Sequence, residues 1–308
     1  MKSTYADVVI MSFNRKKCLE RCLESVVKNT EPGYQLIIVD AGSTDGSREF
    51  LLKEYASKAT LIFEDRCWSY AQSNNNAFRY SRSKYVALLN DDCEVCPGWL
   101  KVCVDAMEND EKIGHAAHVV LRADGDRVMS AGADILPNGN TTIPMMDLSY
   151  SKDRDKIENP EKYGYSMNYA YAGFGVYRRD ILEEVGYLPE FPINVYWDDT
   201  DYGMKVNAVG LDVRLIPQSV IIHFMEHSGR ENHALAAQYG RACFLDRWGI
   251  FLENNDGFHH GGYIDGEKSE FPTIYNGRNF GFGKYKPLPF PVNRKPINPE
   301  EISNKTWR

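Results

Sequence analysis

Residues 89–96 (LNDDCEVC) carry side chains that suit two different kinds of site. The carboxylates of Asp91 and Asp92 offer the hard oxygen ligands that Mg²⁺ and Mn²⁺ prefer, often shared with the phosphate oxygens of a substrate. Cys93-x-x-Cys96 has instead the spacing found in zinc sites and in redox-active cysteine pairs. The first chemistry would serve a phosphorylated substrate, and the second a structural metal or a disulfide.

The oxygen-ligated cation is the better interpretation. A zinc site would need the histidines of the HxxH stretch at 115–118, and these fall on an expected strand, where residues three apart point to opposite faces. Redox-active pairs normally sit at a helix N-terminus, but a Pro-Gly turn follows Cys96. We therefore interpret Cys93 and Cys96 as packing residues around a turn.

Asp40 is a second carboxylate at the end of an apolar run, LIIVD, and a flexible loop follows it. In that position it could accept hydrogen bonds from a nucleobase or a ribose. The next helix needs a cap, and Ser43, Thr44 or Asp45 could provide it. Asp40 is then left without a structural partner.

The stretch WDDTD at 197–201 places three acids at the start of an expected helix. The helix dipole alone would favour them there. The aromatic residues just before them (Phe191, Tyr196, Trp197) indicate the wall of a cleft, where a raised pKa suits a general base. His223 ends another apolar run, and it would be a metal ligand if the ion of Asp92 lies close by.

The first half of the chain alternates between strands and helices. Apolar runs predict strands over 7–11, 35–40, 60–64 and 85–90, and apolar spacings of three and four predict helices over 16–28, 47–56 and 69–81. This alternation is typical of an α/β fold with a Rossmann-like, mostly parallel sheet and helices on both faces. Ligands bind beyond the carboxyl ends of such strands.

The second half is less regular. We expect strands over 113–121, 128–136, 213–216 and 220–223, and helices over 179–185, from within 196–210, and over 232–248. Residues 137–168 are polar and read as an excursion over the surface. The chain after 251 is rich in Pro, Gly and Asn, so we expect a catalytic domain at 1–250 and an irregular extension at 251–308.

The composition excludes some classes of function. The net charge of −7 over 308 residues provides no basic field for nucleic acid or an anionic membrane. No apolar run is long enough to span a bilayer, and the N-terminus lacks the apolar core of a signal peptide. Seven scattered cysteines suit a reducing compartment. We expect a cytoplasmic protein, which could also attach to a membrane surface.

Several segments in this order resemble the family 2 glycosyltransferases, nucleotide-sugar transferases with the GT-A fold, and in particular a rhamnosyltransferase-like branch. The resemblance covers about residues 6–249. It is carried by VVIMSFNRKKCLERCLESV, LIIVDAGSTDGS, SYAQSNNNAFRYSRSKYVALLNDD, YAGFGVYRRDILEEVGYLPE, YWDDTDYGMKV and RACFLDRWG. Ala41 stands where the family usually has a second acidic or amide residue, and Asn90 stands where it usually has the first acid of its DxD metal motif.

The resemblance implies a role for each matching residue and adds a small antiparallel acceptor-side portion to the sheet. Asp199 would be the catalytic base, and Asp92 and His223 would hold Mn²⁺ or Mg²⁺. The donor nucleotide would be bound by Phe13, Asn14, Arg15, Asp40, Arg66, Asn75 and Asp91. Supporting or acceptor-side positions would be Gly173, Trp197, Asp198 and Asp201.

The implied activity is an inverting, metal-dependent transfer of a hexose or deoxyhexose from a nucleoside-diphosphate sugar to a hydroxyl acceptor, such as a glycan, a polysaccharide or another glycoconjugate. Two alternatives remain: a nucleotide-sugar-binding protein with weak catalysis, and a transferase that glycosylates hydroxymethylated bases in DNA. A nucleotidyltransferase would share the sheet and the cation, but it usually carries a glycine-rich loop after the first strand, which MSFNRKKC lacks.

Overall fold

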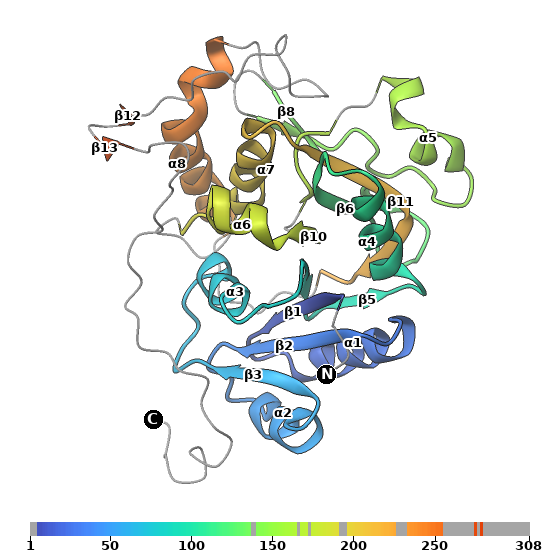
Figure 1. Cartoon of the computed structure of the whole chain (residues 1–308), viewed down its shortest axis with the longest axis vertical. Coiled ribbons are helices and arrows are strands. Elements are labelled where there is room, and N and C mark those ends of the chain that lie inside the picture. The colour runs from blue at the N-terminus through green and yellow to red at the C-terminus, as the bar shows by residue number, and fades with distance from the viewer. Residues whose placement is uncertain are drawn as a thin grey trace.

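The computed structural model of the chain describes residues 5–136, 140–164, 167–171, 174–190, 196–225 and 233–254. Two short strands further along, β12 (Ile274–Tyr275) and β13 (Arg278–Asn279), are described as well. Within these ranges, nine strands form one sheet that crosses the molecule, and helices pack against it (Figure 1).

The expected alternation in the first half is confirmed, with boundaries within a few residues of those predicted. The elements are β1 (Ala6–Ser12), α1 (Lys16–Asn29), β2 (Tyr34–Asp40), α2 (Ser47–Tyr55), β3 (Ala59–Phe63), α3 (Tyr70–Phe78) and β4 (Tyr85–Asn90). These four strands are parallel neighbours in the order β3-β2-β1-β4. Their pairing aligns Ser12 with Asp40 and Met11 with Asn90, so the carboxyl ends meet at one edge.

The second half completes the sheet with shorter and mixed strands. Its elements are β5 (Cys93–Val95), α4 (Trp99–Asn109), β6 (Ile113–Leu121), β7 (Val128–Ser130), β8 (Asp134–Ile135), β9 (Thr141–Thr142), α5 (Arg154–Glu158), a 3-10 turn η1 (Pro160–Tyr163), β10 (Gly175–Arg178), α6 (Arg179–Val185), α7 (Asp198–Ala208), β11 (Asp212–His223) and α8 (His233–Asn254). β10 is antiparallel to β4 and β6, and β5 is antiparallel to β11. The mostly parallel sheet with an antiparallel portion is therefore confirmed.

Four expectations about this half need correction. The strand predicted over 128–136 is two short strands, separated where Gly132 has a φ of +85°. The strands predicted over 213–216 and 220–223 are one irregular strand, β11. The polar segment contains β9, α5 and η1, and α5 buries Ile157. Helix α8 continues past residue 250 to Asn254, so the expected domain boundary falls inside a helix.

Two apolar cores cover the two faces of the sheet. On one face, α1, α2 and α4 pack through residues such as Leu19, Leu51 and Trp99, and on the other α3, α6 and α7 pack through residues such as Phe78 and Tyr202. A third cluster joins α7 to α8 (Figure 1). None of the described helices combines the length and the apolar character needed to cross a membrane.

A buried carboxylate fixes the loop before β4 to the start of β1. Asp7 is fully buried and accepts hydrogen bonds from the hydroxyl of Ser81 (2.6 Å) and from the backbone N–H and hydroxyl of Ser83 (3.0 and 2.7 Å). The backbone N–H of Arg82 donates a fourth bond of 2.7 Å. Because Ser81 and Ser83 are buried too, the Asp7 carboxylate determines where β4 begins.

Replacing this carboxylate should be costly. Asp7→Ala leaves several buried donors without an acceptor, and we expect the free energy of unfolding in urea to fall by about 3 kcal/mol. Asp105→Ala is the matched control, because Asp105 is exposed and its ion pair with Lys101 lies on the surface, where removal should cost less than about 0.5 kcal/mol. Equal losses in the two variants would contradict the role of Asp7.

Candidate active site

Two adjacent aspartates are buried directly after β4, and two basic side chains from distant segments reach them. Arg15 forms ion pairs with Asp91 and, at 3.1 Å, with Oδ2 of Asp92. Nε2 of His223, at the end of β11, lies 3.1 Å from the other oxygen of Asp92. The backbone N–H of Phe224 also donates to the carbonyl of Asp92 at 3.0 Å. The structure thus unites Arg15, Asp91, Asp92 and His223, as the sequence predicts.

The charge at this edge is only partly compensated. Burial raises the pKa of Asp91 to about 7, although Arg15 acts in the opposite direction. Asp91 and Asp92 are both almost entirely buried, so their negative charge cannot be dispersed by water. A further cation at Asp92 would therefore be favoured by the local electrostatics.

The ligand atoms at Asp92 fit a divalent cation. Two neighbouring ligands of an octahedral ion, each about 2.1 Å from it, lie about 3.0 Å apart, and Asp92 Oδ1 and His223 Nε2 are 3.1 Å apart. Among the described residues, one group of at least three His, Cys, Asp or Glu ligand atoms is close enough to share an ion. It consists of Asp92, Cys93 and His223, with the atoms within 4.8 Å of one another.

The Cys-x-x-Cys pair and the HxxH stretch do not come together to form a zinc site. His118 lies against Trp99 and Ser219 on one face of β6, and His115 stacks on Tyr177 on the other. Burial lowers the pKa of both histidines to about 3, which keeps their rings neutral. They are core residues, and the opposite-face argument from strand geometry holds.

The turn that carries Arg15 is held by the loop after β2. Asn14 has a φ of +52°, its N–H donates to the Ser43 hydroxyl at 2.9 Å, and its Oδ1 accepts from the Thr44 N–H at 2.7 Å. The carboxylate of Asp45 accepts from the N–H groups of Lys16 (2.8 Å) and Ser47 (3.1 Å), at the first residues of α1 and α2. The N-cap position of α2 is taken by Gly46 and not by any of the three proposed residues, although Asp45 accepts from the first N–H of α2 from one position earlier. Asn14 positions Arg15.

The expectation that Asp40 has no structural partner is wrong. Arg48, the second residue of α2, forms an ion pair with Oδ2 of Asp40 at 2.7 Å and also donates to the carbonyl of Glu64 at 2.7 Å. Asp40 is fully buried, and burial raises its pKa against the opposing effects of Ser43 and Arg48. A ligand contact at Asp40 would involve a carboxylate that is already paired.

The other expected donor residues lie near the same edge. Phe13 is buried directly after β1, and the Arg66 guanidinium lies over the Trp68 ring, 3.6 Å from its centroid. A Cβ on Gly42 would come within 2.7 Å of Arg66 Cα, so the loops after β2 and β3 touch.

Asn75 was expected to bind the donor, but its side-chain amide is engaged in hydrogen bonds within the protein. Its amide nitrogen donates to the Leu188 carbonyl at 2.8 Å and to Glu190 at 3.0 Å, and its oxygen accepts from the Leu188 N–H. Both amide hydrogens are thus used to hold the segment after α6.

The acidic start of α7 contains three carboxylates in different states. Asp198 is buried, and burial together with Asp199 and Asp201 raises its pKa to about 8. Asp201 is fully buried as well, but Arg247 at 2.5 Å and Lys205 at 3.2 Å outweigh its burial and lower its pKa. Asp199 is half-buried and accepts from the Thr200 N–H at 2.7 Å.

The aromatic context of Trp197 suggested that it forms the wall of a cleft, but Trp197 packs against another helix instead. Its indole N–H donates to the carbonyl of Ala237 at 2.9 Å, and its ring lies 5.1 Å from that of Phe244. Trp197 therefore attaches the start of α7 to α8. Tyr196 is exposed, and both it and Trp197 have positive φ values, 80° and 70°. Gly173 and Phe191 lie outside the described residues.

Tyr70, which sequence reasoning missed, feels the charge of both acidic groups. Its hydroxyl is buried without a hydrogen-bond partner. Burial raises its pKa well above the usual range, and Asp198, Asp199, Cys93 and Asp92 add to the effect. Carboxylates from the ends of β4 and the start of α7 therefore act on one hydroxyl. The sequence offered no signal for Tyr70, because it is an ordinary first residue of a helix.

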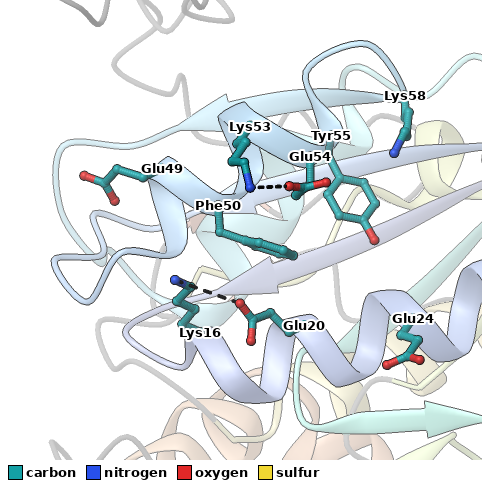
Figure 2. Close-up of a pocket in the computed structure, with 9 residues that line it drawn as sticks. All are labelled: Lys16, Glu20, Glu24, Glu49, Phe50, Lys53, Glu54, Tyr55 and Lys58. Carbon is teal, nitrogen blue, oxygen red and sulfur yellow. Dashed lines mark ion pairs between the residues drawn. The ribbon is translucent and has the colours of Figure 1, made fainter.

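A surface groove of about 620 Å³ lies elsewhere, between α1 and α2 (Figure 2). It is lined by seven charged residues and two aromatic ones, and two of its lysines form ion pairs, Lys16 with Glu20 at 3.9 Å and Lys53 with Glu54 at 2.9 Å. None of the expected site residues lines it, so it is separate from the acidic site.

The chain is similar to proteins of known family. It is 28% identical over 226 residues to the uncharacterized protein y4gI of Sinorhizobium fredii, covering 70% of this chain and 24% of that protein. It is 24% identical over 215 residues to the glycosyltransferase AglE of Haloferax volcanii, covering 66% of this chain and 63% of AglE. The chain thus spans less than two thirds of either relative.

The fold is similar to that of a solved GT-A enzyme. The mannosyltransferase PcManGT from Pyrobaculum calidifontis, in complex with GDP-Man and Mn²⁺, superposes with a TM-score of 0.57 at 18% identity, covering 84% of this chain and 67% of the other. The sequence model of Glycosyl transferase family 2 matches residues 7–186, more than half of the chain. With the aligned strand ends and the paired acids after β4, this match shows that the chain belongs to glycosyl transferase family 2.

Proposed function

We propose that this protein is an inverting, cation-dependent glycosyltransferase that moves a sugar from a nucleoside-diphosphate sugar to a hydroxyl group of a glycan-type acceptor. The observation that carries the proposal is the buried pair of acids at the end of β4, where Arg15 and His223 both lie 3.1 Å from Asp92. Asp92 and Asp199 also both raise the pKa of the Tyr70 hydroxyl. One of these carboxylates has the setting of a metal ligand, and the other that of a base. A transfer reaction needs both within reach of one sugar.

The donor side is served by the ends of β1, β2 and β4. Asp92 and His223 would hold Mn²⁺ or Mg²⁺, which supplies charge neutralisation for the diphosphate as it departs. Arg15 is 21% exposed in its side chain and provides a positive charge next to the same place. Asp40 and Phe13 lie at the adjacent strand ends, where a nucleobase would be bound. PcManGT, whose complex contains GDP-Man and Mn²⁺, supports this class of ligand.

Asp199 is the better general base of the two neighbouring carboxylates. Burial, with Asp199 and Asp201 adding to it, raises the pKa of Asp198 and favours its protonated form, which cannot act as a base. Asp199 is half-buried and is oriented by its hydrogen bond from Thr200. It would take the proton of the acceptor hydroxyl while the oxygen attacks the anomeric carbon opposite the departing diphosphate. One such displacement inverts the anomeric centre.

Nucleotide binding tests the cation site. The purified protein should bind UDP or GDP more tightly with Mn²⁺ than with a chelator, and Asp92→Asn should reduce the Mn²⁺-dependent part more than about tenfold because it removes an anionic ligand. Isothermal titration calorimetry measures both quantities. Asp105→Asn, on the surface of α4, is the control. Equal affinity with and without chelator would refute the role of Asp92.

Paired variants of the acidic helix test the base. Asp199→Asn should lower kcat by about 10²–10⁴-fold while leaving donor affinity unchanged, because it removes proton acceptance alone. Asp198→Asn should retain most of the activity, since Asp198 is already neutral. Release of nucleoside diphosphate during transfer measures kcat. A fully active Asp199→Asn variant would show that the base lies elsewhere.

The raised pKa of Asp198 also predicts how stability depends on pH. Asp198 has a pKa near 3.8 when unfolded and about 8 when folded, so the unfolded chain releases this proton first, and stability falls as the pH rises from about 4 to 8. Asp198→Asn removes this loss. Thermal unfolding should therefore show a larger Tm advantage of the variant over the wild type at pH 8 than at pH 5. An advantage independent of pH would contradict the assignment.

A further inference from the structure

The cation site has a third ligand type that neither the family resemblance nor the acid cluster explains. Cys93 and His223 are directly opposite each other in the antiparallel pair of β5 and β11, so their side chains share one face of the sheet. Asp92 immediately precedes Cys93. The Cys93 Sγ, a carboxylate oxygen of Asp92 and a ring nitrogen of His223 lie within 4.8 Å of one another.

This cluster lies in the interior of the protein and not on its surface. Cys93 is fully buried, Asp92 is 2% exposed and His223 is 9% exposed. The Nδ1 atom of His223 is buried without a hydrogen-bond partner, and the ring is held edge-on against Phe174, 4.9 Å between centroids. The residues are thus positioned before any ligand arrives.

Cys96, the other member of the Cys-x-x-Cys pair, lies outside the cluster. It follows β5, its N–H donates to the Val220 carbonyl at 3.0 Å, and it is half-buried. The pair therefore does not act as a unit: Cys93 belongs with Asp92 and His223, and Cys96 does not. Cys22 is a second buried thiol near Cys93, and its Sγ donates to the Asn90 carbonyl at 3.4 Å.

We propose that Cys93 is a sulfur ligand of the Asp92–His223 cation site, which makes the site selective for thiophilic divalent ions such as Zn²⁺ and Co²⁺ over Mg²⁺. The proposal rests on the proposed cation site and adds a ligand to it. A mixed set of one oxygen, one nitrogen and one sulfur is typical of borderline-soft ions, whereas Mg²⁺ requires oxygen. In a tetrahedral zinc site, sulfur and nitrogen ligands lie about 3.6 Å apart, within the span observed here.

The binding step involves no change of oxidation state. The metal–sulfur bond replaces the S–H bond of Cys93, and the released proton passes to solvent. The proton between His223 Nε2 and Asp92 Oδ1, which lie 3.1 Å apart, would also have to leave to solvent or move to Nδ1 of the ring, so that both atoms can offer a lone pair. Zn²⁺ would then compete with the Mn²⁺ or Mg²⁺ that serves the diphosphate.

Cobalt provides a direct readout of sulfur ligation. The full-length protein, freed of metal by a chelator, should give the near-ultraviolet charge-transfer absorption of a thiolate–Co²⁺ bond when it is titrated with CoCl₂. Cys93→Ser and Cys93→Ala should each abolish that band and weaken Zn²⁺ binding by more than about tenfold, a larger loss than the loss of Mn²⁺ binding. Cys96→Ser and Cys22→Ser are the matched controls and should keep the band.

Each outcome is decisive. If the wild-type protein binds Co²⁺ without a sulfur band, the proposal is overturned, even if no variant folds. It is also overturned if Cys96→Ser or Cys22→Ser removes the band while Cys93→Ser keeps it. If Mn²⁺-dependent nucleotide binding persists in these cases, only the sulfur ligand is refuted. If the wild type binds neither Mn²⁺ nor Co²⁺, the proposed cation dependence fails as well.

Discussion

Two neighbouring carboxylates buried at the end of β4 need hydrogen bonds and positive charge around them, and much of the surrounding architecture serves to bring such partners to them. Asp92 is reached by Arg15 from one side and His223 from the other, although His223 is 131 residues away in sequence. Arg15 can do so because Asn14 is held in a left-handed turn by the loop after β2. His223 can do so because β11 pairs with β5. Burial without such partners would cost several kcal/mol per charge.

The same residue type thereby serves in different protonation states within one site. Asp201 has two cations and a tryptophan N–H, so it stays ionised and holds α8. Burial raises the pKa of Asp198, and the like charges of Asp199 and Asp201 add to the effect, so its protonated form is favoured. Asp199 lies between them, half-buried and oriented by Thr200. The surroundings of each carboxylate, and not the residue type, determine which protonation form is favoured.

The sequence predicts the parts of this molecule that depend on local pattern. Apolar runs and helical spacing gave the first seven elements, and the family-like segments indicated Asp92, Asp199 and His223. The sequence pattern does not predict contacts between residues that are far apart in the chain. The three-residue strand β5 is too short to show periodicity and forms through β11. The hydrogen bond from Trp197 to Ala237 depends on how α8 packs against the start of α7. The ion pair between Arg48 and Asp40 depends on the path of the loop between β2 and α2.

The consecutive left-handed residues Tyr196 and Trp197 have a consequence for how the protein can be re-engineered. Such backbone conformations cost about 1 kcal/mol or more each for residues other than glycine, and persist only where the surroundings fix them. Here the indole of Trp197 and the carboxylate of Asp201 are both fastened to α8. A chimera that borrows an acceptor region from another transferase must therefore take α7 and α8 as one piece. An exchange that divides them would separate the acidic helix from the groups that orient it.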